Sequence, residues 1–393
     1  MIGIRADANE TVATGHIMRC ITIAQELIRL GEEVIFFTAD DGADELLDNA
    51  AMKHVCLDSD WENPEGEIPV LAEQIQTRGI DRLLVDSYRM TYDYFKAMSR
   101  ICKTIYIDDL AECTYPVDML INYNGYHDLF PYESNYENTH GHDEMQVTKL
   151  LLGPSYVPLR EQFRCDATMG KSGDTDFARA RKTRNQVEAS LSDTEVEQSA
   201  KAKQVEHEAT IGDTEAPKKT KVLLSVGGGD IHKAMLAILQ SAKMRPAWDS
   251  YEWHVVVGSF LSNKASLESF ADSNANVHIH ERVTDMAGLM RLCDMAISAA
   301  GTMLYELAAT RVPTIFIVTA DNQKYDSEYF EKNNTMIGAG DIRTNRLAVI
   351  NRTLDCIDRL RTDAELYNKM KEALKQVTDG NGAVRIAEEI VRL

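Results

Sequence analysis

A glycine and a histidine stand side by side just after the first apolar segment, in the run TGHIMR that begins at Thr14. Glycine lets the backbone approach a ligand closely, and the free amides at the start of a following helix attract anions. The positive end of that helix favours the neutral imidazole of His16, which is the form that a general base needs. The alternative is a histidine that only caps or packs beside the loop, because loop histidines are often ordinary.

Two more glycine-containing segments follow predicted strands: residues 225–230 read SVGGGD and residues 298–306 read SAAGTMLYE. Glycines at a strand–helix junction let a phosphate lie against the backbone, although residues 225–230 do not have the Walker pattern. Glu306 lies about one helical turn beyond Thr302, where its carboxylate could accept hydrogen bonds from both hydroxyls of a ribose. The alternative for Asp230 is a helix N-cap. The alternative for Glu306 is a negative charge near the N-terminus of a helix, where it interacts favourably with the helix dipole. Together the two segments predict a ligand that carries phosphates.

Polar residues also follow predicted strands of the first half, in the runs DSY from Asp86, DD from Asp108 and NYNGY from Asn122. Asp, Tyr and Asn side chains suit sugar hydroxyls and amides, although turns favour the same residues. The two adjacent aspartates at 108 and 109 point to opposite faces if they lie on a strand, so we expect no metal site there.

Alternating strands and helices would position these residues. We predict strands in the first half at residues 2–5, 33–38, 54–57, 82–86, 104–108 and 118–122, and in the second half at 221–226, 253–258, 277–280, 295–298 and 314–318. We predict helices at residues 15–30, 233–243, 285–292, 303–310, 322–332 and 363–393, the last broken near 379–382. This alternation predicts an α/β fold of two Rossmann-type domains with mainly parallel sheets and a ligand cleft at the carboxyl ends of the strands.

The composition of the chain argues against several classes of protein. The chain has 393 residues, 44% hydrophobic, with 42 Lys+Arg against 62 Asp+Glu and a net charge of −20. This is globular composition of about two domains, and its acidity argues against a nucleic-acid partner. No apolar stretch approaches the roughly 20 residues of a membrane span, and Arg5 and Asp7 interrupt any signal-peptide core. The seven cysteines form no Cys-x-x-Cys pair, so we expect reduced thiols, a cytoplasmic location and neither metal nor cofactor.

Residues 166–219 differ from the rest, because they are charged and nearly lack large apolar side chains after Phe177. Such composition cannot bury enough surface to offset its ordering entropy. We therefore interpret this segment as a flexible insertion or linker between an N-terminal domain (1–165) and a C-terminal domain (220–393). The functional alternative is a charged arm that docks a protein partner weakly.

The order and spacing of these motifs resemble the UDP-sugar hydrolases of pseudaminic acid biosynthesis, which share a two-domain GT-B architecture with the peptidoglycan N-acetylglucosaminyltransferase. The Gly-His-x-x-Arg signature of that family is matched by Gly15, His16 and Arg19. The resemblance continues through the runs VDSY (85–88), DD (108–109), NYNGY (122–126), GPSYVPLR (153–160), GGGD (227–230), SAAGTMLYE (298–306) and DNQ (321–323). It thus covers most of both predicted domains.

The resemblance implies hydrolysis of UDP-2,4-diacetamido-2,4,6-trideoxy-β-L-altropyranose to UDP and the free sugar, with inversion and with His16 as general base. It implies sugar-binding residues at Gly15, Arg19, Asp86, Tyr88, Asn124 and Tyr126. The implied UDP-binding residues are Gly228, Gly229, Gly301, Thr302, Glu306, Asn322 and Gln323. Spore-coat polysaccharide proteins carry similar sequences, so the pathway stays open.

Two other functions remain open at this point. One is a glycosyltransferase of the same fold, which uses a UDP-sugar donor and an acceptor other than water. The other is a protein that binds a nucleotide-sugar without turning it over, since fold alone does not fix function.

Overall fold

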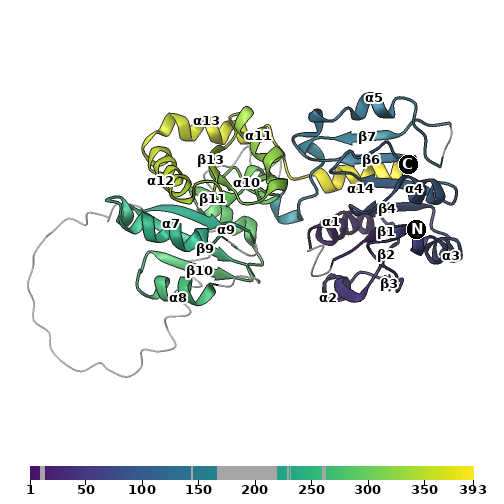
Figure 1. Ribbon diagram of the computed structural model, residues 1–393, viewed down its shortest axis with the longest axis horizontal. Coiled ribbons are helices and arrows are strands. Elements are labelled where there is room, and N and C mark those ends of the chain that lie inside the picture. The colour runs from purple at the N-terminus through teal and green to yellow at the C-terminus, as the bar shows by residue number, and fades with distance from the viewer. Residues whose placement is uncertain (9–13, 143–144, 166–218, 228–229, 231, 259–262) are drawn as a thin grey trace, which may run out of the picture. The chain divides into compact units, whose positions relative to one another are not determined.

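Seven apolar strands from the first part of the chain pair in parallel in the computed structural model of the protein, which describes residues 1–8, 14–142, 145–165, 219–227, 230, 232–258 and 263–393. Their order is β3-β2-β1-β4-β5-β6-β7 (Figure 1). The strands are β1 (Ile2–Ala6), β2 (Val34–Thr38), β3 (His54–Cys56), β4 (Arg82–Asp86), β5 (Lys103–Ile107), β6 (Met119–Asn122) and β7 (Lys149–Leu152). All five residues of β1, an inner strand, are buried, as expected for a sheet covered on both faces.

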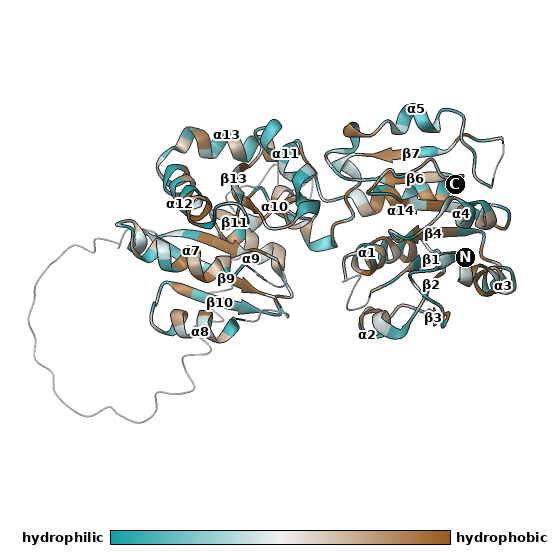
Figure 2. Cartoon of the chain, in the orientation of Figure 1, coloured by the Kyte–Doolittle hydropathy of each residue, from teal (hydrophilic) through white to brown (hydrophobic). Residues whose placement is uncertain are grey.

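Helices cover both faces of this sheet because alternate residues of each strand point to opposite sides. On β5, Ile105 and Ile107 join the core beneath α1, whereas Tyr106 joins the core beneath α3 and α4. The helices of this part are α1 (Gly15–Arg29), α2 (Asp44–Asn49), α3 (Ile68–Arg78), α4 (Tyr92–Met98) and α5 (Tyr132–Tyr136). In Figure 2, hydrophobic residues lie along the strands and the inner sides of the helices, while the outer sides are hydrophilic.

A second parallel sheet follows, and its described strands run in the order β10-β9-β8-β11-β12-β13. These are β8 (Thr220–Ser225), β9 (Tyr251–Val257), β10 (Val277–Glu281), β11 (Met295–Ala299), β12 (Thr314–Val318) and β13 (Ile337–Asp341). The helices are α7 (Ala234–Lys243), α8 (Lys264–Asp272), α9 (Met286–Leu292), α10 (Met303–Ala309), α11 (Lys324–Lys332), α12 (Arg346–Thr362), α13 (Ala364–Leu374) and α14 (Gly382–Arg392). In both sheets the first strand in sequence lies between two later strands, β1 between β2 and β4 and β8 between β9 and β11. The strand order therefore reverses at this strand, which creates a switch point beside it.

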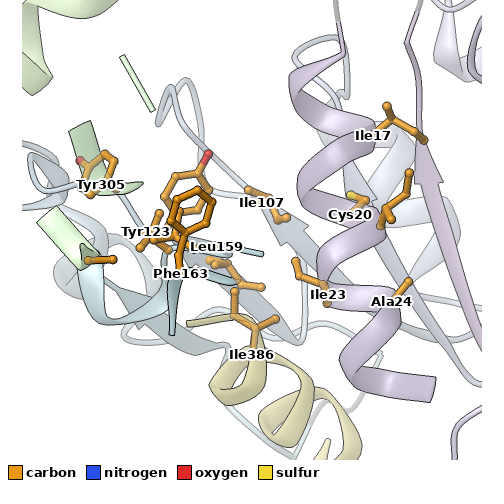
Figure 3. Close-up of a cluster of buried hydrophobic side chains, with 14 of the residues drawn as sticks. Ile17, Cys20, Ile23, Ala24, Ile107, Tyr123, Leu159, Phe163, Tyr305 and Ile386 are labelled. Atoms are coloured by element: carbon orange, nitrogen blue, oxygen red, sulfur yellow. The ribbon is translucent and has the colours of Figure 1, made fainter. Parts of the chain in front are cut away.

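The last helix, α14, returns to the first sheet and packs against α1. Figure 3 shows Ile386 of α14 in the same buried cluster as Ile23 and Ala24 of α1. Arg82 at the start of β4 donates from Nη1 to the carbonyl of Ile390 at 3.1 Å. The segments Met1–Arg164 and Lys219–Leu393 therefore form one compact unit.

The predicted α/β fold of two parallel-sheet domains is confirmed, and the predicted strands match observed ones. Two strands were missed. β7 has only four residues, and β13 reads IGAGD, with two glycines that are unfavourable in strands. Helices α2 to α5, α8 and α12 were not predicted at specific residues either. The segment 166–219 lies outside the described residues except for Lys219, and the domain boundaries stay predictions.

No helix in the described part of the chain has the length and apolar character needed to span a bilayer.

We expect Gly382→Ala to destabilise the fold, because a Cβ at Gly382 would lie 2.1 Å from the backbone oxygen of Val157. Overpacking against backbone typically costs about 1–3 kcal/mol, which urea unfolding would show as a lower midpoint at unchanged slope. Gly66→Ala is the control, because its Cβ would meet nothing closer than 3.5 Å. Unchanged stability of Gly382→Ala would contradict the close packing between α14 and residues 153–164.

Candidate functional site

A cavity of about 870 Å³ opens at the carboxyl ends of the strands and is lined by residues from both sheets. Most of the predicted site residues line it: Gly15, His16, Arg19, Tyr88, Asn124, Tyr126, Gly301, Thr302, Glu306, Asn322 and Gln323. Asp86 lies behind the cavity wall and is only 1% exposed. The predicted phosphate-binding Gly228 and Gly229 lie outside the described residues. The fold thus brings both groups of predicted residues to one cavity, while their roles stay predictions.

Helix α1 positions His16 in its first turn. Ile17, Cys20 and Leu27 recur at helical spacing and are buried against the sheet, which fixes the rotation of the helix. His16 and Arg19 are three residues apart and therefore lie on one side of the helix. That side meets the end of β4, where Asp86 is the last residue of the strand.

The imidazole of His16 is held by a short contact, 2.6 Å from its Nδ1 to Oδ1 of Asp86. Nδ1 carries the proton in this arrangement because a carboxylate only accepts, and this leaves Nε2 as the basic nitrogen. The Nη2 of Arg19 also lies 3.1 Å from Nδ1, but it cannot donate to a protonated nitrogen. The ring of Tyr88 packs edge-on against the imidazole, with 4.4 Å between centroids. His16 is therefore held from two sides.

Asp86 is held in turn by Arg19, whose Nε and Nη2 donate to its two carboxylate oxygens at 2.5 Å each. Such a two-pronged pair is the strong geometry for Arg and carboxylate. Burial by itself would raise the pKa of Asp86, but the charges of Arg19 and His16 outweigh burial and hold this pKa well below its usual range. Asp86 therefore stays ionised at neutral pH and can orient His16.

Arg19 extends the network to the cavity wall. Its Nη1 donates to Oδ2 of Asp109 at 2.9 Å and to the hydroxyl of Tyr123. Asn124 donates from Nδ2 to Oδ1 of Asp109 at 2.9 Å, and Tyr88 donates from its hydroxyl to Oδ2 at 3.2 Å. The loops after three neighbouring strands, β4, β5 and β6, are thereby tied to one guanidinium.

The neighbouring Asp108 has a structural role instead. Its Oδ1 accepts from the amides of Leu110 and Ala111 at 3.0 Å each, and its Oδ2 accepts from the hydroxyl of Tyr132. The two aspartates thus make separate contacts. Across the described residues there is no group of three or more His, Cys, Asp or Glu side chains suited to a metal ion.

On the side of the second sheet, Glu306 lies in α10 and faces the cavity. Its Oε1 accepts from Nη2 of Arg160 at 3.2 Å. Burial raises the pKa of Glu306, and Arg160 only partly offsets this. Helix α10 has only seven residues, which gives it a short dipole for the anion site predicted at Gly301 and Thr302.

Gln323 is oriented by the end of β12. Its Oε1 accepts from the backbone amide of Thr319 at 2.8 Å and from the Thr319 hydroxyl at 3.1 Å. The side-chain NH₂ is therefore the group that Gln323 can offer to a ligand. Asn322 lines the same part of the cavity.

Several residues of the cavity wall were not predicted from the sequence, among them Asp326 of α11 and Arg160 after β7. Arg160 belongs to the run GPSYVPLR, which carries the family resemblance but no predicted binding residue. Asp326 lies in a charged helical stretch, DSEYFEK, where nothing in the sequence separates it from exposed acidic residues. Its burial depends on contacts between distant segments, which spacing does not reveal.

Comparison with known proteins gives sequence matches over part of the chain. Residues 199–386 match the glycosyltransferase family 28 C-terminal domain. The chain is 28% identical over 176 residues to the UDP-N-acetylglucosamine–N-acetylmuramyl-(pentapeptide) pyrophosphoryl-undecaprenol N-acetylglucosamine transferase of Listeria welshimeri, covering 42% of this chain and 46% of that protein. It is 22% identical over 165 residues to the spore coat polysaccharide biosynthesis protein SpsG of Bacillus subtilis, covering 42% and 48%. The matches thus span about half the length of these curated relatives.

Solved structures extend the likeness to the whole chain. The crystal structure of MurG from Acinetobacter baumannii superposes over 100% of both chains with a TM-score of 0.61 and 14% identity. Identity this low shows the fold alone. The fold is GT-B, two parallel-sheet α/β domains of the glycosyltransferase type.

We expect Asp86→Asn to cost about 3 kcal/mol of stability at pH 7, because it leaves the buried Arg19 without its main partner. The pKa of Asp86 is lower in the folded protein than in the unfolded chain, where it is about 3.9. The stability that ionised Asp86 contributes is therefore complete above the unfolded-state pKa and is lost as the pH falls through the folded-state pKa. The difference in free energy of unfolding between wild type and variant should be constant from pH 7 to 5 and should narrow below about pH 4.

Urea unfolding at pH 7, 5 and 3.5 measures this gap. Asp93→Asn, which changes an exposed residue, is the control and should stay within about 0.5 kcal/mol of wild type. A gap that widens on acidification would contradict an ionised, paired Asp86.

Proposed function

We propose that this chain transfers a sugar from a UDP-sugar donor to an acceptor hydroxyl, with inversion at the anomeric carbon. The observation that carries the proposal is the buried His16–Asp86 pair at the wall of a cavity that also holds Glu306. The Listeria relative, whose name states a UDP-N-acetylglucosamine donor, supports the nucleotide-sugar. The match of residues 199–386 to a glycosyltransferase domain supports the reaction class.

In this mechanism Nε2 of His16 accepts the proton of the acceptor hydroxyl as its oxygen attacks the anomeric carbon. The bond from that carbon to the UDP oxygen breaks on the opposite face, which inverts the configuration and leaves UDP with the bonding electrons. Asp86 keeps the imidazole in the tautomer with a free Nε2 and stabilises the imidazolium that forms. Such base assistance is typically worth about 10²–10⁴-fold in rate.

The nucleotide lies on the second sheet in this proposal. The Glu306 carboxylate accepts hydrogen bonds from the ribose hydroxyls, and Arg160 keeps that carboxylate in place. The side-chain NH₂ of Gln323 is free to donate, because its oxygen is already bonded to Thr319. The sugar faces Tyr88, Asn124 and Tyr126 from the first sheet.

Hydrolysis, implied by the resemblance to the pseudaminic acid enzymes, is the second candidate. It uses the same residues, with water as the acceptor. His16 is only 5% exposed and lies against the edge of Tyr88, which favours a small acceptor. A UDP-diacetamido-trideoxyhexose is the donor expected for this candidate.

UDP release separates the two candidates. The full chain is given UDP-N-acetylglucosamine or a UDP-diacetamido-trideoxyhexose, either alone or with a lipid-linked muramyl acceptor of the kind in the Listeria relative's name. Release that depends on the acceptor supports transfer, and equal release in water alone supports hydrolysis. Binding of every donor without release under any condition would contradict both and indicate a nucleotide-sugar-binding protein.

We expect His16→Ala to lower turnover by about 10²–10⁴-fold while leaving the Kd for UDP unchanged, because the base acts only in the chemical step. His278→Ala, which changes a histidine with a 44% exposed side chain in β10, should keep wild-type turnover. Calorimetry with UDP and a coupled UDP-release assay measure both quantities. Undiminished turnover of His16→Ala would remove His16 from the reaction.

We expect Glu306→Gln to weaken UDP binding about tenfold, because a charged acceptor for the ribose hydroxyls is replaced by a neutral one. The sharper comparison uses 2′-deoxy-UDP. Wild type should prefer UDP over this analogue, and the preference should be smaller in the variant, since the amide oxygen is a weaker acceptor than the carboxylate. A preference of equal size in wild type and Glu306→Gln would mean that Glu306 does not contact the ribose 2′-hydroxyl.

A further inference from the structure

Three histidines and a glutamate gather on one face of the second sheet, and the mechanism above uses none of them. On β9 the run YEWHVVV alternates, so Trp253 joins the buried core on one face while Glu252 and His254 point to the other. On β10 the run VHIHE places His278 and His280 on that second face, with His278 paired directly with His254. We call Glu252, His254, His278 and His280 the histidine cluster.

His254 lies in the middle of the histidine cluster and is 5% exposed. Its ring stacks on that of His280 with 5.2 Å between centroids, and its centroid lies 5.3 Å from that of His278. Nε2 of His254 lies 3.0 Å from Oε1 of Glu252, and its Nδ1 lies 2.9 Å from Nε2 of His280. Both ring nitrogens are thus engaged, one within β9 and the other across to β10.

The contact between His254 and His280 needs one hydrogen between its two nitrogens. A carboxylate only accepts, so Nε2 of His254 carries a proton and donates to Glu252. When both rings are neutral, Nε2 of His280 donates to Nδ1 of His254, and when one ring is charged a single hydrogen still lies between them. When both rings are charged, two N–H groups face each other and the bond is lost. The pair therefore tolerates one added proton but not two.

The surroundings supply little negative charge to hold a second proton. The charged and titratable groups that face His254 are Lys221 of β8, Glu252 of β9, and His278 and His280 of β10. Glu252 is shared with Lys221, whose Nζ lies 3.4 Å from its Oε1. Cys293 and Asp294, which follow α9, lie near Lys221, and Asp294 accepts from the backbone amide of Lys221 at 2.8 Å.

Folding therefore withholds protons from the histidine cluster. Burial lowers the pKa of His254 from its ordinary value of 6.5 to about 4, with Glu252 opposing this and the other two histidines adding to it. Burial and His278 also lower the pKa of His280. Because the unfolded chain binds these protons more tightly, the stability of this part of the sheet is greatest above about pH 6.5 and falls as the pH approaches 4.

Strand β10 is the part of the sheet that is least held by other contacts. It lies at the edge of the described sheet, where it pairs with β9, and of its five residues only Val277 is buried. Helix α8 lies beside it (Figure 1), and of the nine residues of α8 only Leu267 is buried. Elements with few buried apolar contacts open at a lower free energy than the rest of a fold.

We propose that the histidine cluster is a proton-sensitive contact between β9 and β10, which keeps the edge of the second sheet closed near neutral pH and releases β10 with α8 when acid charges both His254 and His280. The inference is independent of the proposed function, because none of the four residues is among the described residues that line the cavity. It makes local opening of this edge the first response of the fold to acid.

Hydrogen exchange of backbone amides at pH 7 and pH 5 tests the inference, with each rate divided by the intrinsic rate at that pH. We expect the protection of β10 amides in wild type to fall about 10- to 30-fold, because a ring whose pKa rises from about 4 to 6.5 on opening binds its proton that much more tightly in the open form. The protection of β1 amides should fall by about threefold or less.

Two variants separate the proton effect from packing. His254→Leu removes the central ring, so the acid-induced loss of protection in β10 should shrink to about threefold or less. His280→Gln offers both an acceptor and a donor to His254 whatever its charge, so the loss should take an intermediate value. His54→Gln, which changes a partly exposed histidine of β3 in the first sheet, is the control and should behave as wild type.

Three results would overturn the inference: no loss of protection in β10 of wild type, an equal loss in β1 and β10, or a loss in β10 that keeps its full size in both variants. A general loss of stability in His254→Leu lowers protection at both pH values alike, so the ratio between pH 5 and pH 7 still reports the proton effect. If His254→Leu does not fold, an unchanged loss in His280→Gln alone overturns the inference.

Discussion

The buried ion pair between Arg19 and Asp86 is the contact on which the rest of the site depends. It joins the first helix to the end of β4 and holds Asp86 as a carboxylate in a place where burial alone would favour the neutral acid. The same carboxylate fixes His16, and the same guanidinium fixes Asp109 and Tyr123. A buried ion pair of this kind adds little net stability, because desolvation offsets much of the attraction. Its value here is that it orients the imidazole.

The second constraint is close backbone contact where the chain passes between the sheets. It does so once through residues 153–164 and again before α14. Gly380 and Gly382 leave no room for a side chain, since a Cβ at either would meet backbone atoms of Phe163 or Val157 within 2.5 Å. Leu159 and Phe163 lie in the same buried cluster as Tyr305 and Ile386 (Figure 3). This packing makes one cavity from loops of both sheets.

The sequence predicted the features that depend on local pattern. Apolar strands, the amphipathic face of α1 and the glycines after strands all leave periodic or compositional signals, and the parallel sheets follow from their alternation. The same pattern indicated His16 and Glu306, because both stand just after strands. Features that depend on distant contacts were not predictable. Asp326 looks like any exposed acidic residue in its helix, and the return of α14 to the first sheet leaves no local trace. The glycine-rich strand β13 was missed because its sheet context overrides poor propensity.

Nitrogen-15 NMR of the histidine side chains measures which ring nitrogen of His16 carries the proton, with the His16 signal assigned by its loss in His16→Gln. We predict that neutral His16 carries its proton on Nδ1, bonded to Asp86, and that Nε2 is unprotonated. We also expect this preference to be lost in Asp86→Asn. A proton on Nε2 in wild type would contradict the account, because the nitrogen available to the cavity could not then accept a proton from an acceptor.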